Sequence, residues 1–211
     1  MTDPFPTQDS FQRPKGTLAV FAAAWHGLLH TVAVQRNMKI HWISGFMVML
    51  VGMALDFDLT ARAALFFCVF MILFAEIMNS ALEAFVDLHM QQYDYQAKLA
   101  KDAAAAGVLT LAAAVVVLFA DIIARYYRQV VFASGDAILR TCLFGLPVVA
   151  LMWMMLFTNT ARWLKHVALL IGLASLTPLI MQSRDPFFSL TAGAFFLVAY
   201  RARIKHPKGL R

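Results

Sequence analysis

Four polar side chains occur at helical spacing within the apolar stretch formed by residues 75–87. They are Glu76, Asn79, Glu83 and Asp87. In an α-helix these positions fall within about 80° of one another, so they share one face. Carboxylates in an apolar helix are costly, and neighbouring like charges repel unless a cation binds between them. This acidic stripe predicts a cation-binding site. A simpler alternative is that these side chains lie at the solvent-exposed end of a helix, where Lys98, Lys101 or water satisfies them.

A second charged group follows a polar connection. Lys98 and Asp102 lie one helical turn apart and are expected to pair, which leaves Lys101 free to meet an anion. Such residues suit phosphoryl transfer: carboxylates hold Mg²⁺ on phosphates, a basic residue neutralises charge, and another carboxylate orients or deprotonates a hydroxyl. The sequence has no P-loop and no protein-kinase signature. Any nucleotide site must be of another kind.

The composition indicates that these residues sit in a membrane. Of the 211 residues, 61% are hydrophobic and 14% are charged, whereas soluble domains carry about a quarter charged residues. Six apolar stretches approach the length of about 20 residues that a spanning helix needs: about 40–55, 63–86, 103–124, 139–158, 164–181 and 187–200. The last is short and either spans the membrane or lies tilted, re-entrant or interfacial. We therefore expect an all-α integral membrane protein.

The N-terminal region divides into a tail and a helix. Residues 1–14 are polar and rich in proline, which predicts a flexible tail. Residues 15–36 place apolar side chains at helical spacing and predict an amphipathic helix at the membrane interface, or a solvated helix packed on the bundle. The sequence shows no cleavable signal peptide.

The basic residues predict the orientation and the partners. With six spans and a cytoplasmic N-terminus, thirteen of the 18 Lys and Arg residues fall inside and five outside, as cytoplasmic loops require. We expect a multi-pass inner-membrane protein with a cytoplasmic N-terminus. The net charge of +6 is scattered and does not form a stripe, which favours lipid head groups over nucleic acid as the partner.

The motifs of the first two-thirds resemble a known family. The run Glu76-x-x-Asn79-Ser80-Ala81-x-Glu83-Ala84-x-Val86-Asp87, followed by Ala100-Lys101-Asp102, is similar to the signature of prokaryotic diacylglycerol and undecaprenol kinases. Upstream resemblances are Phe21-x-x-Ala24-x-x-Gly27, Arg36-Asn37-Met38-Lys39-Ile40-His41 and Leu55-Asp56-x-Asp58. The resemblance covers about residues 15–124.

The resemblance implies a homotrimer of three-span subunits, each with a surface helix, that phosphorylates a lipid hydroxyl with MgATP at the cytoplasmic interface. Its site residues carry over by position. Glu76 would be the general base and Glu83 a metal ligand; Lys101, Asp102 and Asp87 would bind nucleotide, with Asn79 and Lys98 as supports. Gln35 stands where the family has a second metal-holding glutamate, and an amide brings no negative charge, so metal affinity should fall. The alternative is that Gln35 has no role in the site and is an ordinary surface polar residue.

Residues 125–211 have no counterpart in that family's core, and we predict a C-terminal membrane extension of about three spans without an assigned chemistry. Its basic end is expected to contact anionic head groups; the residues are Arg201, Arg203, Lys205, Lys208 and Arg211.

Three functions follow as hypotheses. The leading one is ATP-dependent phosphorylation of diacylglycerol or undecaprenol at the inner face of the membrane. The second is a catalytically impaired relative that binds lipid or nucleotide, or acts as a scaffold. A weaker third is a transporter, although the two halves of the sequence show no symmetry.

Overall fold

The computed structural model describes residues 16–90, 92–133, 135–183 and 185–205, and the described residues form helices joined by short turns. The predicted tail, residues 1–14, lies outside the described residues. In chain order the elements are α1 (Thr17–Val34), α2 (Arg36–Ala54), α3 (Leu59–His89), α4 (Tyr95–Arg125), the π-helical turn η2 (Gln129–Ala133), α5 (Gly135–Arg140), the π-helical turn η3 (Thr141–Gly145), α6 (Leu146–Phe157), α7 (Arg162–Gln182) and α8 (Pro186–Lys205).

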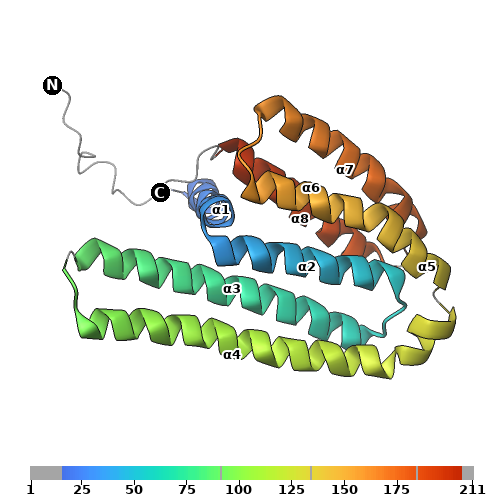
Figure 1. Cartoon of the computed structure of the whole chain (residues 1–211), viewed down its shortest axis with the longest axis horizontal. Helices are drawn as coiled ribbons and strands as arrows, with labels where there is room; N and C mark the ends of the chain where they lie inside the picture. Colours follow the sequence, from blue (N-terminus) through green and yellow to red (C-terminus); the bar gives the residue numbers. More distant parts are fainter. Residues whose placement is uncertain (1–15, 91, 134, 184, 206–211) are drawn as a thin grey trace.

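The long helices run alongside one another, except α1, which crosses them (Figure 1). By length and composition, six helical stretches of the described chain can cross a membrane: α1, α3, α4, residues 135–157, α7 and α8. The helix α2 is absent from this set because its first turns carry Asn37, Lys39 and His41, yet it lies parallel to the other spans (Figure 1). The transverse course of α1 fits the predicted interfacial helix, and the all-α membrane fold is confirmed.

The two halves of α1 have different environments. In the first half Leu18, Phe21 and Trp25 are exposed, whereas Leu29 and Val32 in the second half are buried. The second half packs against α8, α2 and α3. The apolar side chains of the first half are therefore left for the lipid surface, where an interfacial helix buries its apolar face.

The core centres on α2, which packs against α3 on one side and against α6 and α8 on the other. The Trp42 side-chain N–H donates a hydrogen bond to the Phe195 carbonyl oxygen at 2.9 Å, and the two rings stack at 4.4 Å. The Phe188 ring occupies the space that a Cβ atom at Gly52 would need. Small residues let membrane helices approach closely in this way, so the C-terminal segment packs directly on the N-terminal one.

The last helix is longer than the stretch expected at 187–200: it has 20 residues, is apolar enough to cross a membrane, and has half of its apolar length buried. The prediction for its basic end is corrected. Arg203 does not belong to a tail that contacts head groups, because it is 5% exposed and its Nε atom donates to the Met155 carbonyl oxygen at 2.9 Å. Arg201 and Lys205 are exposed, and Lys208 and Arg211 lie outside the described residues.

Candidate functional site

Two capped helices position the charged residues. Asp58 begins α3 by accepting a hydrogen bond from the Ala61 N–H at 2.7 Å, and Asp94 begins α4 by accepting from the Ala97 N–H at 2.8 Å. Side-chain caps of this kind satisfy N–H groups that an α-helix leaves free in its first turn. The two helices then run back along each other as a hairpin (Figure 1). The last turns of α3 therefore face the first turns of α4.

Three of the four acidic-stripe residues, Glu76, Asn79 and Glu83, lie within two turns of α3, and two of them are hydrogen-bonded to each other. Glu76 is 2% exposed and Asn79 is 6% exposed. The Asn79 Nδ2 atom donates to Glu83 Oε1 at 3.0 Å. Glu76 Oε2 and Asn79 Oδ1 are buried and accept no hydrogen bond from the described residues. Buried oxygens are rarely left in this state, so these two acceptors are available to a proton donor or a cation.

The fourth acidic-stripe residue, Asp87, pairs with the next helix. Lys101 Nζ lies 2.8 Å from Asp87 Oδ1. The prediction that Lys101 stays free is therefore wrong, and within the described residues no ion pair joins Lys98 to Asp102. The hairpin explains the difference, because it places Asp87 across from Lys101, whereas the prediction considered partners along one helix only. Lys98 and Asp102 are both exposed.

Gln35 occupies the turn between α1 and α2. Its backbone N–H donates to the Thr31 carbonyl oxygen at 3.0 Å, and its carbonyl oxygen accepts from the Lys39 N–H at 3.2 Å. Its half-buried side chain makes no hydrogen bond to the acidic stripe within the described part of the chain. Across those same residues, no group of three or more His, Cys, Asp and Glu side chains gathers to hold a metal ion. The predicted metal ligands Gln35 and Glu83 are thus not linked to each other by a hydrogen bond between described residues.

Comparison with known proteins identifies the segment that carries the acidic stripe. Residues 22–123 match the family model described as prokaryotic diacylglycerol kinase. This segment, just under half of the chain, is similar to that family. The matched kinase-family segment begins within α1 and ends within α4, so it holds every predicted site residue.

Two curated relatives align with the kinase-family segment. A diacylglycerol kinase of Synechocystis sp. is 36% identical over 112 residues, which cover 53% of this chain and 64% of that protein. An undecaprenol kinase of Bacillus subtilis is 29% identical over 92 residues, which cover 44% of this chain and 75% of that protein. The chain thus spans less than two thirds of the length of the Synechocystis kinase. No solved structure matches the chain significantly.

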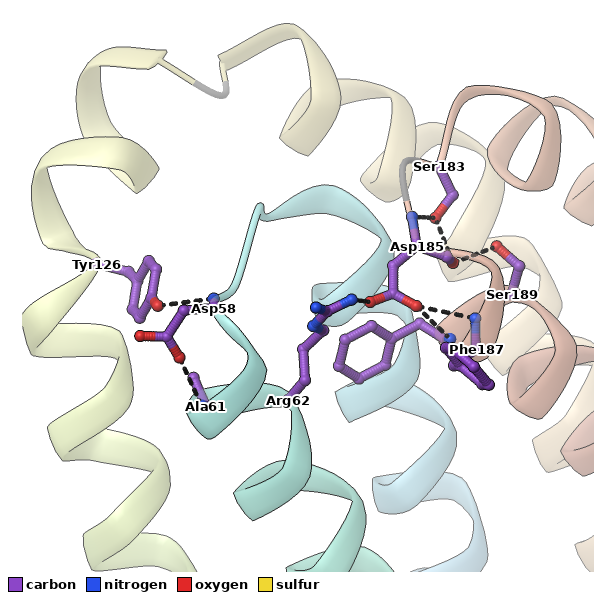
Figure 2. Close-up of polar contacts among 9 residues, drawn as sticks. Asp58, Ala61, Arg62, Tyr126, Ser183, Asp185, Phe187 and Ser189 are labelled. Carbon is purple, nitrogen blue, oxygen red and sulfur yellow. Dashed lines mark hydrogen bonds and ion pairs between the residues drawn. The ribbon is translucent and has the colours of Figure 1, made fainter.

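The sequence did not predict one ion pair, that between Arg62 and Asp185. Arg62, counted there only as an outer charge, lies in the first turn of α3 and pairs with Asp185, in the turn before α8 (Figure 2). A single arginine at the start of a long apolar helix was the available signal, since a charge at that position needs a partner. This pair lies at the start of α3, 14 residues before Glu76.

Proposed function

We propose that this protein is an ATP-dependent lipid kinase that phosphorylates the hydroxyl group of diacylglycerol or undecaprenol at the cytoplasmic face of the bacterial inner membrane. The observation that carries the proposal is the pair of buried oxygens, Glu76 Oε2 and Asn79 Oδ1, that lack hydrogen-bond partners. They lie in a helix of the kinase-family segment, and the relatives that align with it are named as lipid kinases.

Glu76 is the proposed general base. Its unpartnered Oε2 atom accepts the proton of the lipid hydroxyl as the hydroxyl oxygen forms a bond to the γ-phosphorus of ATP. The bond between that phosphorus and the bridging oxygen breaks, which releases ADP. Glu76 is 2% exposed, and this burial suits the role because it shields the base from water.

The chemistry of the donor set fits Mg²⁺, which prefers carboxylate and amide oxygens. Glu83 and Gln35 are its proposed ligands, and the free Asn79 Oδ1 oxygen is of the same type. Mg²⁺ neutralises charge on the transferred phosphate when it is bound. The hydrogen bond from Asn79 to Glu83 fixes the orientation of that carboxylate before the ion arrives.

The nucleotide side of the proposed site lies across the hairpin. The Asp87 carboxylate holds the Lys101 ammonium group at the end of α3, where this cation can meet a phosphate of ATP. Asp102 and Lys98 are exposed beside it and are proposed to complete the nucleotide contacts. The ion pair orients Lys101 in the absence of nucleotide, so less side-chain freedom is lost when ATP binds.

The proposed assembly is a homotrimer in which the N-terminus faces the cytoplasm. Only 11% of the apolar stretch of α4 is buried within one chain, which leaves a long helix face for neighbouring copies or for lipid. The distribution of basic residues supports the orientation.

The test is phosphate transfer by the purified full-length protein. With MgATP labelled at the γ-phosphate, we expect labelled lipid product from diacylglycerol or undecaprenol, resolved by thin-layer chromatography. Glu76→Gln and Glu83→Gln should each lower the rate by at least about a hundredfold, since a positioned base or metal ligand contributes that much. Absence of transfer to both lipids by the wild-type protein would overturn the proposal.

The matched control is Asp121→Asn, which also converts a carboxylate to an amide on a long helix. Asp121 is exposed and, among the described residues, forms an ion pair with Arg125, one turn away. Surface pairs of this kind contribute little, so the rate should stay within about twofold of wild type.

A second candidate function is that of an impaired family member that binds lipid or nucleotide without turnover. Gln35 favours it, because an amide replaces the negative charge that the resemblance places at this position. Gln35→Glu separates the two functions in the same transfer assay. Activity that emerges only in this variant identifies a lapsed kinase, whereas a wild-type protein that is active and barely changed identifies a working one.

A further inference from the structure

Two hollows meet at the Arg62–Asp185 ion pair. One is a polar cavity of about 520 Å³ whose charged lining residues are Asp56, Arg62, Asp136, Arg140 and Asp185. The other is an apolar groove of about 400 Å³ between α3 and α8, lined mainly by Leu59, Ala63, Phe66, Phe70, Phe187 and Thr191. Arg62 and Asp185 line both. A polar cavity that adjoins an apolar groove suits a ligand with a polar head and an apolar chain.

The ion pair leaves a buried donor of Arg62 unused. Arg62 Nη1 donates to Asp185 Oδ2 at 2.6 Å, and Asp185 Oδ1 accepts from the Phe187 and Phe188 N–H groups at 2.8 and 3.4 Å (Figure 2). The Nε atom of Arg62 is buried and has no hydrogen-bond partner in the described structure. An unsatisfied donor on a cation carries a desolvation penalty. It therefore indicates an acceptor group that binds where the two hollows meet.

The other charges of the cavity indicate what kind of head group this is. Arg140 and Asp136 lie one turn apart on α5, both are exposed, and no ion pair between described residues involves either of them. The cavity thus offers a cation and a carboxylate together. A purely anionic head group would be repelled by the carboxylates of Asp56, Asp136 and Asp185. An uncharged head group would form no ionic contact with either the cation or the carboxylate. Charge complementarity selects a group that carries both a phosphate and an amine.

The groove has the dimensions of a lipid chain. It follows α3 from Leu59 to Phe70, which corresponds to about 16 Å of helix, close to half of a hydrocarbon core of about 30 Å. Its polar end coincides with the start of α3 and the turn before α8, where helices leave the hydrocarbon region. One acyl chain can lie in the groove while the head group stays in the cavity.

We infer that this site binds a zwitterionic phospholipid of the phosphatidylethanolamine type. Its phosphate contacts Arg62 Nε and Arg140, its ammonium group contacts Asp136, and one acyl chain occupies the groove. The site does not depend on the proposed kinase activity, because Arg62 and Glu76 are 14 residues apart in one helix, or about 21 Å. Much of the cavity wall belongs to residues 125–211, so this binding gives the C-terminal extension a role.

The test measures lipid binding to the purified full-length protein by native mass spectrometry. Phosphatidylethanolamine should bind about tenfold more tightly than phosphatidylcholine or phosphatidylglycerol with the same chains, as one charge-assisted hydrogen bond provides. Soluble phosphoethanolamine should bind far more weakly, since it cannot fill the groove. Equal affinity for the three lipids overturns the charge assignment, and tight binding of phosphoethanolamine overturns the role of the groove.

Three variants divide the site into its parts. Arg140→Gln should weaken phosphatidylethanolamine and phosphatidylcholine alike, by about tenfold. Asp136→Asn should remove the preference for the ethanolamine lipid, because the methylated ammonium of choline donates no N–H bond. Ala63→Trp should fill the groove and weaken every lipid. Affinities that stay at wild-type values in all three variants overturn the inference.

Two control variants separate these effects from general disturbance. Arg128→Gln removes another exposed arginine near α5, and Ala174→Trp adds the same bulk at an exposed alanine of α7. Neither residue lines the cavity or the groove. Both variants should bind the three lipids as the wild-type protein does. A tenfold loss in either control would show that the binding is not localised at this site.

Discussion

Glu76 and Asn79 each hold a buried oxygen that accepts no hydrogen bond in the described structure. Carboxylates repel when they share a helix face. Here the Asn79 amide donates a hydrogen bond to Glu83, and the Lys101 ammonium group pairs with Asp87. The unsatisfied acceptors and Asp87, which pairs with Lys101, lie along one face of α3. At the scale of single residues, the site is arranged to gain hydrogen bonds or ionic contacts when a ligand binds.

Lys101 provides the prediction at this scale. The ion pair is solvent-exposed, with side-chain exposures of 33% for Lys101 and 67% for Asp87, so it adds little to folding. If Lys101 binds a nucleotide phosphate, Lys101→Gln should raise the KM for ATP by about tenfold or more and leave the thermal midpoint nearly unchanged. Steady-state kinetics and thermal unfolding in detergent measure the two. Lys205→Gln, a change at an exposed lysine of α8, is the control and should alter neither.

Helix ends are the weak points of a bundle of this kind, because the last carbonyl groups of a helix lack partners within it. Buried cations from other helices satisfy several of them here. Arg203 in α8 donates to the carbonyl oxygens of Met155 and Thr158 at the end of α6, at 2.9 and 3.1 Å. Lys165 in α7 donates to the Arg203 carbonyl oxygen at 3.3 Å. These contacts tie three helices together at one end of the C-terminal segment.

Arg203→Met is the prediction at the scale of elements. It keeps an unbranched apolar stem but removes the Arg203 donors from the buried Met155 carbonyl group and from the Thr158 carbonyl group, so the free energy of unfolding should fall by about 2 kcal/mol. Thermal unfolding in detergent measures the change. Arg201→Met, two residues earlier, removes an exposed arginine and should shift the midpoint little. If the two variants unfolded at the same temperature, the contacts of Arg203 would not stabilise the bundle.

The whole molecule is one bundle, although the family match ends within α4. The stacking of Trp42 on Phe195 joins the segments in the middle of the bundle. The Arg62–Asp185 pair joins them at one end. Burial alone would raise the pKa of Asp185, but hydrogen bonds from Arg62 and from the Phe187 and Phe188 N–H groups outweigh it and hold the pKa below its ordinary value.

This lowered pKa predicts an acid-dependent loss of stability. In the unfolded state Asp185 binds a proton near the ordinary aspartate pKa of about 3.9, whereas in the folded state it binds the proton only at a lower pH. The contribution of Asp185 is therefore complete above the ordinary pKa and is lost as the pH falls through the folded value. Asp185→Asn should be less stable than wild type at pH 7 and should lose less stability on acidification. Thermal midpoints measured from pH 7 to pH 3 test this, and Asp121→Asn should keep the wild-type slope.

The sequence by itself determined the membrane environment, the helical elements and the similarity of residues 22–123 to a kinase family. Long apolar runs leave few alternatives to spanning helices, because a bilayer requires every backbone group to be bonded within the segment. The spacing of Glu76, Asn79 and Glu83 placed them on one helix face, since α-helical geometry is local and periodic. Their family motif was recognisable for the same reason, as it lies within continuous stretches of the chain.

Only the tertiary structure decided which partners these groups meet. Lys101 turned to Asp87 across the hairpin, Arg203 turned inward to α6, and Arg62 found Asp185 more than 120 residues away. Such contacts depend on how whole helices pack, and packing combines many weak contacts that no local pattern encodes. The joined polar cavity and apolar groove likewise exist only because α3, α5 and the turn before α8 come together.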